Sequence, residues 1–407
     1  MKAPAYKIYL LYSLTVSALF FMAFTVNTLY RIERAHLDAL QLVLVGTALE
    51  LSIFLFEVPT GVVADVFGRR ASVIIGIFII AAAFLMEGLL PIFGTILIAQ
   101  VLWGLGYTFT SGALSAWITD EIGEENAAAA FMRGTQFEQF GALAGVVAGT
   151  LTGMLGINLP ILLSGGLLSG FGVFLLFQMP EHGFHSRSRE GRDRSGAMLD
   201  TLSEGLRLVR SRPALNNLLG IGFFLGLYSE GLDRLWIAHM LDRFNFSGPQ
   251  PVVWFGVISG VGMLLSAAAA GALEKHTSLR RNLTLAAGLS ASILLLLASF
   301  LGFILAGNLW LAIGLYWVVT VLRQTSSPMY TALINRRLDP QVRATVLSMS
   351  SQVDACGQIA GGPLAGLVAR QFSISAGLFT SLGMLAPALG FLPRLLSGEL
   401  KEEKSRE

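Results

Sequence analysis

Charge is scarce in this sequence. Only 13% of its 407 residues are Asp, Glu, Lys or Arg, about half the share of an ordinary soluble protein. The 28 basic and 26 acidic residues give a net charge of +2, without the basic domain that nucleic-acid binding requires. A chain of this length with so few charges cannot cover a water-facing surface, so the composition predicts a membrane protein.

Reactive groups are also few. The single cysteine, Cys356, excludes an intrachain disulfide and argues against a Cys-based metal site. The five histidines lie in or near predicted loops and lack zinc-like spacing, and the chain has no Gly-x-x-x-x-Gly-Lys-Ser/Thr loop to bind ATP. We therefore expect no enzymatic activity, no catalytic residues, no metal and no cofactor. The expected energy source is a proton gradient.

Long apolar runs repeat from end to end, and 54% of the residues are hydrophobic. A membrane helix needs about 20 apolar residues, and charged or Gly/Pro-containing breaks separate nearly all of the runs. The first run is too long for a signal peptide. We predict twelve membrane helices, at 8–30, 41–63, 71–93, 95–119, 129–156, 159–179, 214–237, 252–273, 283–305, 309–331, 343–369 and 373–396.

Basic residues fall mainly on one side of these helices. With the N-terminus inside, 22 of the 28 Lys and Arg lie in inner segments, whereas the outer loops hold Arg31, Arg34, Arg243 and Arg370. This positive-inside bias predicts cytoplasmic termini in a plasma (inner) membrane.

The longest polar stretch divides the helices six and six. We predict an N-terminal bundle at 1–180, a cytoplasmic linker at 181–213, a C-terminal bundle at 214–397 and a cytoplasmic tail at 398–407. The segment 61–70 has a weak echo at 271–281, and the same spacing of 210 residues relates Arg133 to Arg343. Two landmarks at one spacing predict a duplicated six-helix unit, as in transporters whose halves rock about a central site.

The segment 61–70 reads Gly-Val-Val-Ala-Asp-Val-Phe-Gly-Arg-Arg. It resembles the loop between the second and third helices of the major facilitator superfamily, and the preceding segment 56–60 is similar to bacterial drug-efflux-like members. The resemblance implies an all-α membrane protein with two pseudo-symmetric six-helix bundles, and a loop that latches the two halves at the cytoplasmic side. The implied latch residues are Gly61, Asp65, Gly68, Arg69, Arg70 and, at the start of the eleventh helix, Arg343.

In that family the first, fourth, seventh and tenth helices line a central cavity. Aromatic residues with scattered hydrogen-bonding groups on those helices suit an amphipathic organic solute. Within the seventh helix, Glu230 and Arg234 are spaced to form a local ion pair. The candidate cavity residues are Phe24, Asn27, Gln100, Trp103, Tyr107, Ser111, Phe223, Glu230, Tyr316, Arg323 and Gln324.

Ionisable residues inside hydrocarbon are costly, so each of them calls for a partner or a function. Glu57, Glu138 and Asp354 fall within predicted helices and are candidates for proton coupling, with structural hydrogen bonding as the alternative. Glycines recur at every fourth position from Gly141 to Gly153, which predicts close packing of the fifth helix.

We therefore expect a monomeric secondary transporter in a lipid bilayer, which exports a small amphipathic or hydrophobic solute in exchange for protons. Import or efflux of a polar metabolite such as a sugar is the alternative among transporters. A lipid-handling or receptor-like membrane protein is the alternative of another class, and the internal repeat and the latch loop disfavour a receptor.

Overall fold

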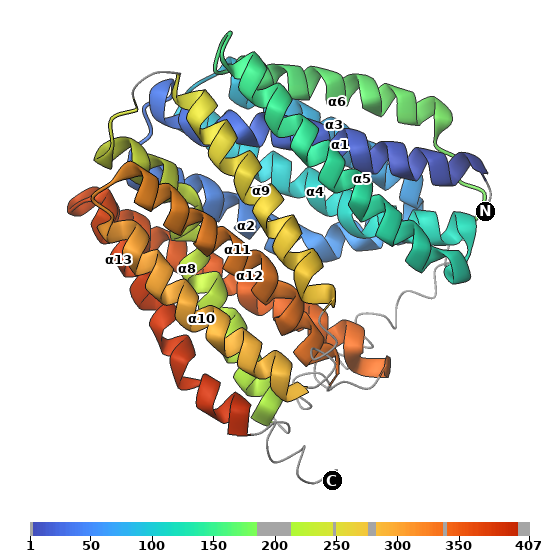
Figure 1. Cartoon of the computed structure of the whole chain (residues 1–407). Helices are drawn as coiled ribbons and strands as arrows, with labels where there is room; N and C mark the ends of the chain where they lie inside the picture. The colour runs from blue at the N-terminus through green and yellow to red at the C-terminus, as the bar shows by residue number, and fades with distance from the viewer. Residues whose placement is uncertain (1–2, 185–212, 247–249, 276–281, 337–339, 398–407) are drawn as a thin grey trace. The chain divides into compact units, whose positions relative to one another are not determined.

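The computed structural model describes residues 3–184, 213–246, 250–275, 282–336 and 340–397. Over these residues the chain forms twelve α-helices and no strand (Figure 1). The chain divides into two compact units: unit 1 is Met1–Glu190 with Asn245–Gly260, and unit 2 is Gly191–Phe244 with Val261–Glu407. The predicted domain boundaries remain a prediction, because most of the 181–213 linker and the 398–407 tail lie outside the described residues.

Unit 1 contains the first six helices, whose ends follow local sequence signals. Asp38 begins the second helix with a capping box in which Asp38 and Gln41 hydrogen-bond each other's backbone N–H. Gly68, at φ +110°, separates the second helix from the third, and Gly123, at φ +88°, separates the fourth from the fifth. The helices are α1 (Ala3–Glu33), α2 (Ala39–Phe67), α3 (Arg69–Leu89), α4 (Phe93–Ile122), α5 (Glu124–Gly153) and α6 (Leu159–Gln178).

Unit 2 contains most of the remaining helices. The helix α9 (Pro251–Lys275) is divided between the two units at Gly260. The last predicted span starts as an α-helix and tightens to the 3₁₀ helix η2 (Ala386–Gly390), where Pro387 cannot donate a backbone hydrogen bond. The other helices are α8 (Pro213–Arg243), α10 (Asn282–Leu305), α11 (Leu309–Asn335), α12 (Pro340–Gln371) and α13 (Ile374–Leu385).

The twelve helices confirm the predicted order of spans. Eight are long and apolar enough to cross a membrane by length and composition, counted over the described residues. The other four, α5, α8, α11 and α12, have 27 to 32 residues, so at 1.5 Å per residue they also reach across a bilayer. Their lower hydropathy reflects polar side chains and glycines, and three of them line the cavity described below.

Glycines bring the first and fifth helices of each unit into backbone contact. The glycines on α5 lie so close to α1 that an added Cβ would meet α1 carbonyl oxygens, which confirms the predicted packing role of the ladder. On α12, glycines approach α8 in the same way. The contacts are Gly141 to Leu14, Gly145 to Ala18, Gly149 to Met22, Gly357 to Phe223 and Gly361 to Leu227.

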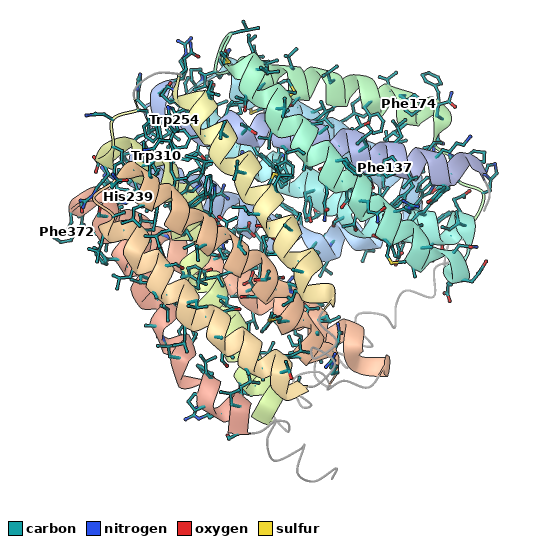
Figure 2. All side chains as sticks on the ribbon, in the orientation of Figure 1. Phe137, Phe174, His239, Trp254, Trp310 and Phe372 are labelled. Atoms are coloured by element: carbon teal, nitrogen blue, oxygen red, sulfur yellow. The ribbon has the colours of Figure 1, made fainter. Side chains whose placement is uncertain are left out.

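Large apolar side chains remain exposed on the outside of the helices (Figure 2). Phe174 is 38% exposed, Trp310 67% and Phe372 76%. So much exposed apolar surface is compatible with lipid rather than water around the helices. Trp310 at the start of α11 and Phe372 just after α12 occupy helix ends, where aromatic side chains favour the membrane interface.

Candidate functional site

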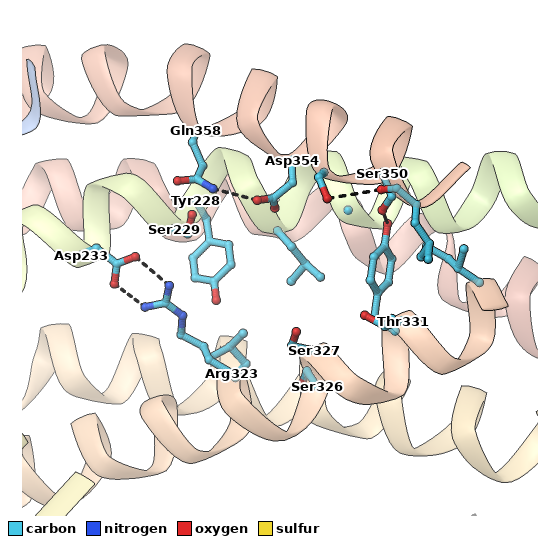
Figure 3. Close-up of a pocket in the computed structure, with 17 residues that line it drawn as sticks. Tyr228, Ser229, Asp233, Arg323, Ser326, Ser327, Thr331, Ser350, Asp354 and Gln358 are labelled. Atoms are coloured by element: carbon cyan, nitrogen blue, oxygen red, sulfur yellow. Dashed lines mark hydrogen bonds and ion pairs between the residues drawn. The ribbon is translucent and has the colours of Figure 1, made fainter. Parts of the chain in front are cut away.

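A cavity of about 470 Å³ lies inside unit 2 (Figure 3). Its lining comes from α8, α10, α11 and α12, and it includes two acids, Asp233 and Asp354, and one basic residue, Arg323, among the described residues. Cavities of this size bind small organic molecules. The other polar side chains are mostly hydroxyls, namely Tyr228, Ser229, Ser326, Ser327, Tyr330, Thr331, Ser350 and Ser351.

Asp233 on α8 and Arg323 on α11 form an ion pair at the cavity wall. The guanidinium donates from Nη1 to Oδ1 and from Nη2 to Oδ2, the second bond being 2.7 Å long, so the carboxylate is held bidentately. The guanidinium carbon lies 5.8 Å from the ring centre of Tyr228. The side chains of Arg323 and Asp233 remain 29% and 43% exposed, so a solute in the cavity can reach both charges.

A second cavity, of about 390 Å³, lies on the same ion pair. Its lining consists of Asp233 and Arg323 with Tyr316, Thr320 and Gln324. The ring of Tyr316 stacks on Trp236 with the two centres 4.2 Å apart, which fixes its position. Three predicted cavity residues, Tyr316, Arg323 and Gln324, therefore meet here.

Asp354 on α12 lies in the wall of the larger cavity. The side-chain amide of Gln358, one turn further on, donates a 2.7 Å hydrogen bond to its Oδ2. Nearby, the hydroxyls of Tyr330 and Ser350 hydrogen-bond each other at 2.9 Å (Figure 3). Asp354 is also close enough to Arg323 and Asp233 to interact with both electrostatically. Asp354 thus has an amide, and Asp233 a guanidinium, as its hydrogen-bond partner in this lining.

Phe223 and Glu230, the other candidates on α8, are not part of this lining as described. Phe223 packs edge-on against Phe224, with ring centres 5.4 Å apart. Glu230 is 2% exposed, and it accepts a 2.8 Å hydrogen bond from Nε of Arg234, which confirms the predicted local ion pair.

Aromatic residues gather in unit 1 on α1, α3 and α4. The ring of Trp103 stacks on that of Tyr107 with the ring centres 5.4 Å apart, and it packs against the ring of Phe24 with the centres 5.6 Å apart. Phe20 and Phe84 complete the cluster. Phe24 and Tyr107 are 40% and 38% exposed, so part of this aromatic surface is open. The cluster includes three of the predicted cavity residues and can bind the apolar part of a solute.

The acids predicted for unit 1 lie close to this cluster. Glu138 on α5 accepts a 3.3 Å hydrogen bond from Ser13, and its backbone carbonyl accepts one from Ser17. Glu57 and Glu138 both interact electrostatically with Tyr107. Each is an exposed residue of its helix, so both remain candidates for proton coupling.

The remaining candidates on α1 and α4 are less open than the aromatic surface. Asn27 is 5% exposed and Ser111 is half-buried. Gln100 is 5% exposed, and its amide donates a 2.8 Å hydrogen bond to Oε2 of Glu87.

That contact belongs to a buried charge network which the sequence did not reveal. Nε of Arg31 lies 2.8 Å from Oε1 of Glu87, and both side chains are at most 3% exposed. The hydroxyl of Tyr30 donates to the backbone carbonyl of Glu87. The predicted place of Arg31 in an outer loop is wrong, because α1 continues to Glu33 and includes Arg31 in its last turn; Arg243 and Arg370 likewise lie in the last turns of α8 and α12. The only signal was an acid inside the predicted third span.

The segment 61–70, predicted as a loop, is the end of α2, the turn at Gly68 and the start of α3, and it forms charge contacts within unit 1. Asp65 lies 3.9 Å from Arg69, which in turn lies 3.1 Å from Asp120 at the end of α4. The backbone N–H of Arg70 donates to Glu181, and the Arg70 guanidinium donates to the carbonyl of Leu176. Gly68 makes the tight turn in which a Cβ would touch Glu181, whereas Gly61 lies in open space. The Arg343 side chain is outside the described residues.

A family model matches most of the chain. The model described as Major Facilitator Superfamily covers residues 8–351. The chain belongs to this superfamily. Superfamily membership makes the protein an integral membrane protein of a transporter family and confirms the predicted architecture of two six-helix bundles.

Two kinds of relative show how far the similarity extends. The chain is 22% identical over 388 residues to YxaM of Bacillus subtilis (strain 168), an uncharacterized MFS-type transporter, covering 93% of this chain and 94% of YxaM. The nucleoside transporter NupG has the same fold, with a TM-score of 0.78, 14% identity and coverage of 98% and 99%. A bacterial homologue of the human lysosomal transporter Spinster aligns with a TM-score of 0.71, 15% identity and coverage of 98% and 97%.

The superfamily loop leads to a prediction for Asp65. Asp65→Asn keeps the shape of the side chain but removes its charge, so we expect normal expression and turnover lower by up to about tenfold, or about 1.4 kcal/mol. The effect is limited because the carboxylate is 41% exposed beside Arg69. Turnover is measured in vesicles, with Glu124→Gln at the exposed start of α5 as the control. Wild-type turnover in Asp65→Asn would contradict the latch role.

Proposed function

We propose that this protein is a proton-coupled secondary transporter that exports a small amphipathic organic solute in exchange for protons. The observation that carries the proposal is the position of Asp354: the acid lines a cavity of about 470 Å³ with an amide as its hydrogen-bond partner. The guanidinium in the same cavity is already bound by Asp233.

This arrangement supports exchange. An antiporter needs an acid that holds a proton when the cavity is empty and releases it when solute binds. Asp354 can do this because it lines the cavity together with Arg323 and Asp233, so a solute that binds there changes the charges around its carboxyl group. Glu57 and Glu138 of unit 1 are the alternative proton carriers.

The amphipathic character of the solute is inferred from the lining of the unit 2 cavity. The cavity offers hydroxyls and charges, and beside them the apolar side chains of Leu225, Leu296 and Leu347. A solute with a polar and an apolar part matches this lining.

A polar metabolite is the second candidate. The hydroxyl-rich lining of the unit 2 cavity favours it, because sugars and similar solutes are bound through hydrogen bonds. NupG, with the same fold, is a nucleoside transporter. Under either candidate we expect a monomer in the plasma membrane with both termini cytoplasmic and no cofactor.

The experiment is transport by the purified protein in liposomes, with a pH gradient of either sign and a panel of dyes, drugs and sugars. For the wild type we expect accumulation driven by one sign of the gradient. Asp354→Asn should abolish this accumulation but retain downhill movement of the same solute, because Asn can hydrogen-bond but cannot carry the proton. The matched control is Cys356→Ser, an exposed position two residues further along α12.

If Asp354→Asn keeps full gradient-driven transport, the proton carrier is Glu57 or Glu138 instead, which Glu57→Gln and Glu138→Gln test. If all three variants keep gradient-driven transport, proton coupling through these residues is wrong and a sodium-coupled or uniport mechanism explains the transport better.

A further inference from the structure

The Asp233–Arg323 ion pair is the part of the wall that the two cavities of unit 2 have in common. Both residues line the larger cavity and the smaller one, and no other residue lines both as described. The pair joins α8 to α11 across 90 positions of sequence (Figure 3). Separating the two side chains would therefore connect the two cavities.

The charges restrict which solute can separate them. A purely anionic solute that binds Arg323 leaves the Asp233 carboxylate without a counter-charge. A purely cationic solute that binds Asp233 leaves the guanidinium unpaired in the same way. Either unpaired charge, at a cavity wall where the two side chains are only partly exposed, carries a penalty that offsets part of the new contact.

A zwitterion avoids both penalties. Its carboxylate can take the bidentate position of Asp233 on the Arg323 guanidinium, and its ammonium can bind the Asp233 carboxylate. One ion pair is exchanged for two, and neither protein charge is left alone. No proton is needed for this exchange, so Asp354 stays available for coupling.

We propose that the solute is a small zwitterion of the amino-acid type, which inserts between Asp233 and Arg323 and thereby joins the two cavities. The inference rests on the proposed transport function and names the class of its solute. The hydroxyl of Ser327, one turn from Arg323 on α11, lies in the same lining and can donate a hydrogen bond to the solute carboxylate. The apolar part of the solute then occupies the rest of the cavity, beside Leu225 and Leu296.

The test compares three charge forms of each of three amino acids. Alanine, leucine and phenylalanine are each measured as the free amino acid, as the C-terminal amide, which is cationic, and as the N-acetyl form, which is anionic. Binding to the full chain in detergent is followed by isothermal titration calorimetry and by thermal shift. For at least one of the three compounds, the free amino acid should bind at least about tenfold tighter than both of its derivatives.

Two variants assign that preference to the ion pair. Asp233→Asn with Arg323→Gln removes both charges together, so no unpaired charge remains, and the three forms should then bind with equal affinity. Asp233→Arg with Arg323→Asp restores a pair with its polarity reversed, and the free amino acid should again bind tighter than its derivatives. A purely structural ion pair would change the melting temperature without changing the ranking of the three forms.

The inference is overturned if no free amino acid binds better than both derivatives, or if the doubly neutral variant keeps the preference. Because binding is measured without a membrane, it is independent of transport. If the amino acid binds as expected but no pH gradient drives it into liposomes, the proposed proton-coupled function is wrong and the zwitterion-binding site is supported. If a pH gradient drives another solute and binding shows no preference for the zwitterion, the transport function is supported and this inference is wrong.

Discussion

Arg323→Ala is expected to weaken solute binding about 30-fold, or about 2 kcal/mol. The substitution removes a bidentate donor from Asp233 and leaves that carboxylate at the cavity wall without its partner. The lower end of the usual range for truncating a charge pair applies, because the two side chains are 29% and 43% exposed and water screens part of the interaction.

The same variant should also move the pH profile of transport to higher pH. A carboxylate that loses a neighbouring positive charge ionises at higher pH, and Asp354 lies in the same cavity lining as Arg323. The profile is measured as initial transport rate in liposomes between pH 5 and 9. Any process that needs an ionised carboxylate in this cavity then begins only at the higher pH.

Two comparison variants make this result interpretable. Arg323→Lys keeps the positive charge but lacks the planar fork, so we expect a smaller loss of binding and little shift of the profile. Val318→Ala, on the exposed side of the same helix, should behave as the wild type. Wild-type affinity together with an unaltered pH profile in Arg323→Ala would show that the arginine serves neither role.

Local patterns were sufficient to predict the helices. Hydropathy depends only on residues that are neighbours in the sequence, and all twelve expected spans coincide with helices. The Glu230–Arg234 pair and the glycine ladder were also predictable, because each depends only on the periodicity of one helix. The length of α1 could not be predicted in this way, because its last turn is stabilised by Glu87 on another helix.

Contacts between helices could not be predicted in the same way. Asp233 lies on α8, but its partner Arg323 lies 90 residues further along the chain on α11. Which faces of two helices meet depends on their rotation and packing, and one sequence without homologues does not specify them. The same limit explains why Gln100 was expected to line a cavity, whereas the structure shows it hydrogen-bonded to Glu87.

The buried Glu87 network gives the largest expected change in stability. Glu87→Ala removes the carboxylate that binds both Arg31 and Gln100, at a site where Glu87 and Arg31 are 1% and 3% exposed. An arginine left buried without its counter-charge destabilises a protein by about 3–5 kcal/mol. We therefore expect a clearly lower melting temperature in detergent, and a low yield of folded protein.

The cause can be separated from simple loss of volume. Glu33→Ala removes an exposed carboxylate from the end of α1 and should leave the melting temperature unchanged. Glu87→Leu with Arg31→Met replaces both buried charges by apolar groups, so it should recover most of the stability that Glu87→Ala loses. A melting temperature for Glu87→Ala equal to that of Glu33→Ala would mean that water or another group stabilises the Arg31 charge in place of the carboxylate. Because Phe24 precedes Arg31 by about two turns on α1 and Trp103 follows Gln100 by one turn on α4, the network also fixes the two helix faces that carry the candidate aromatic surface.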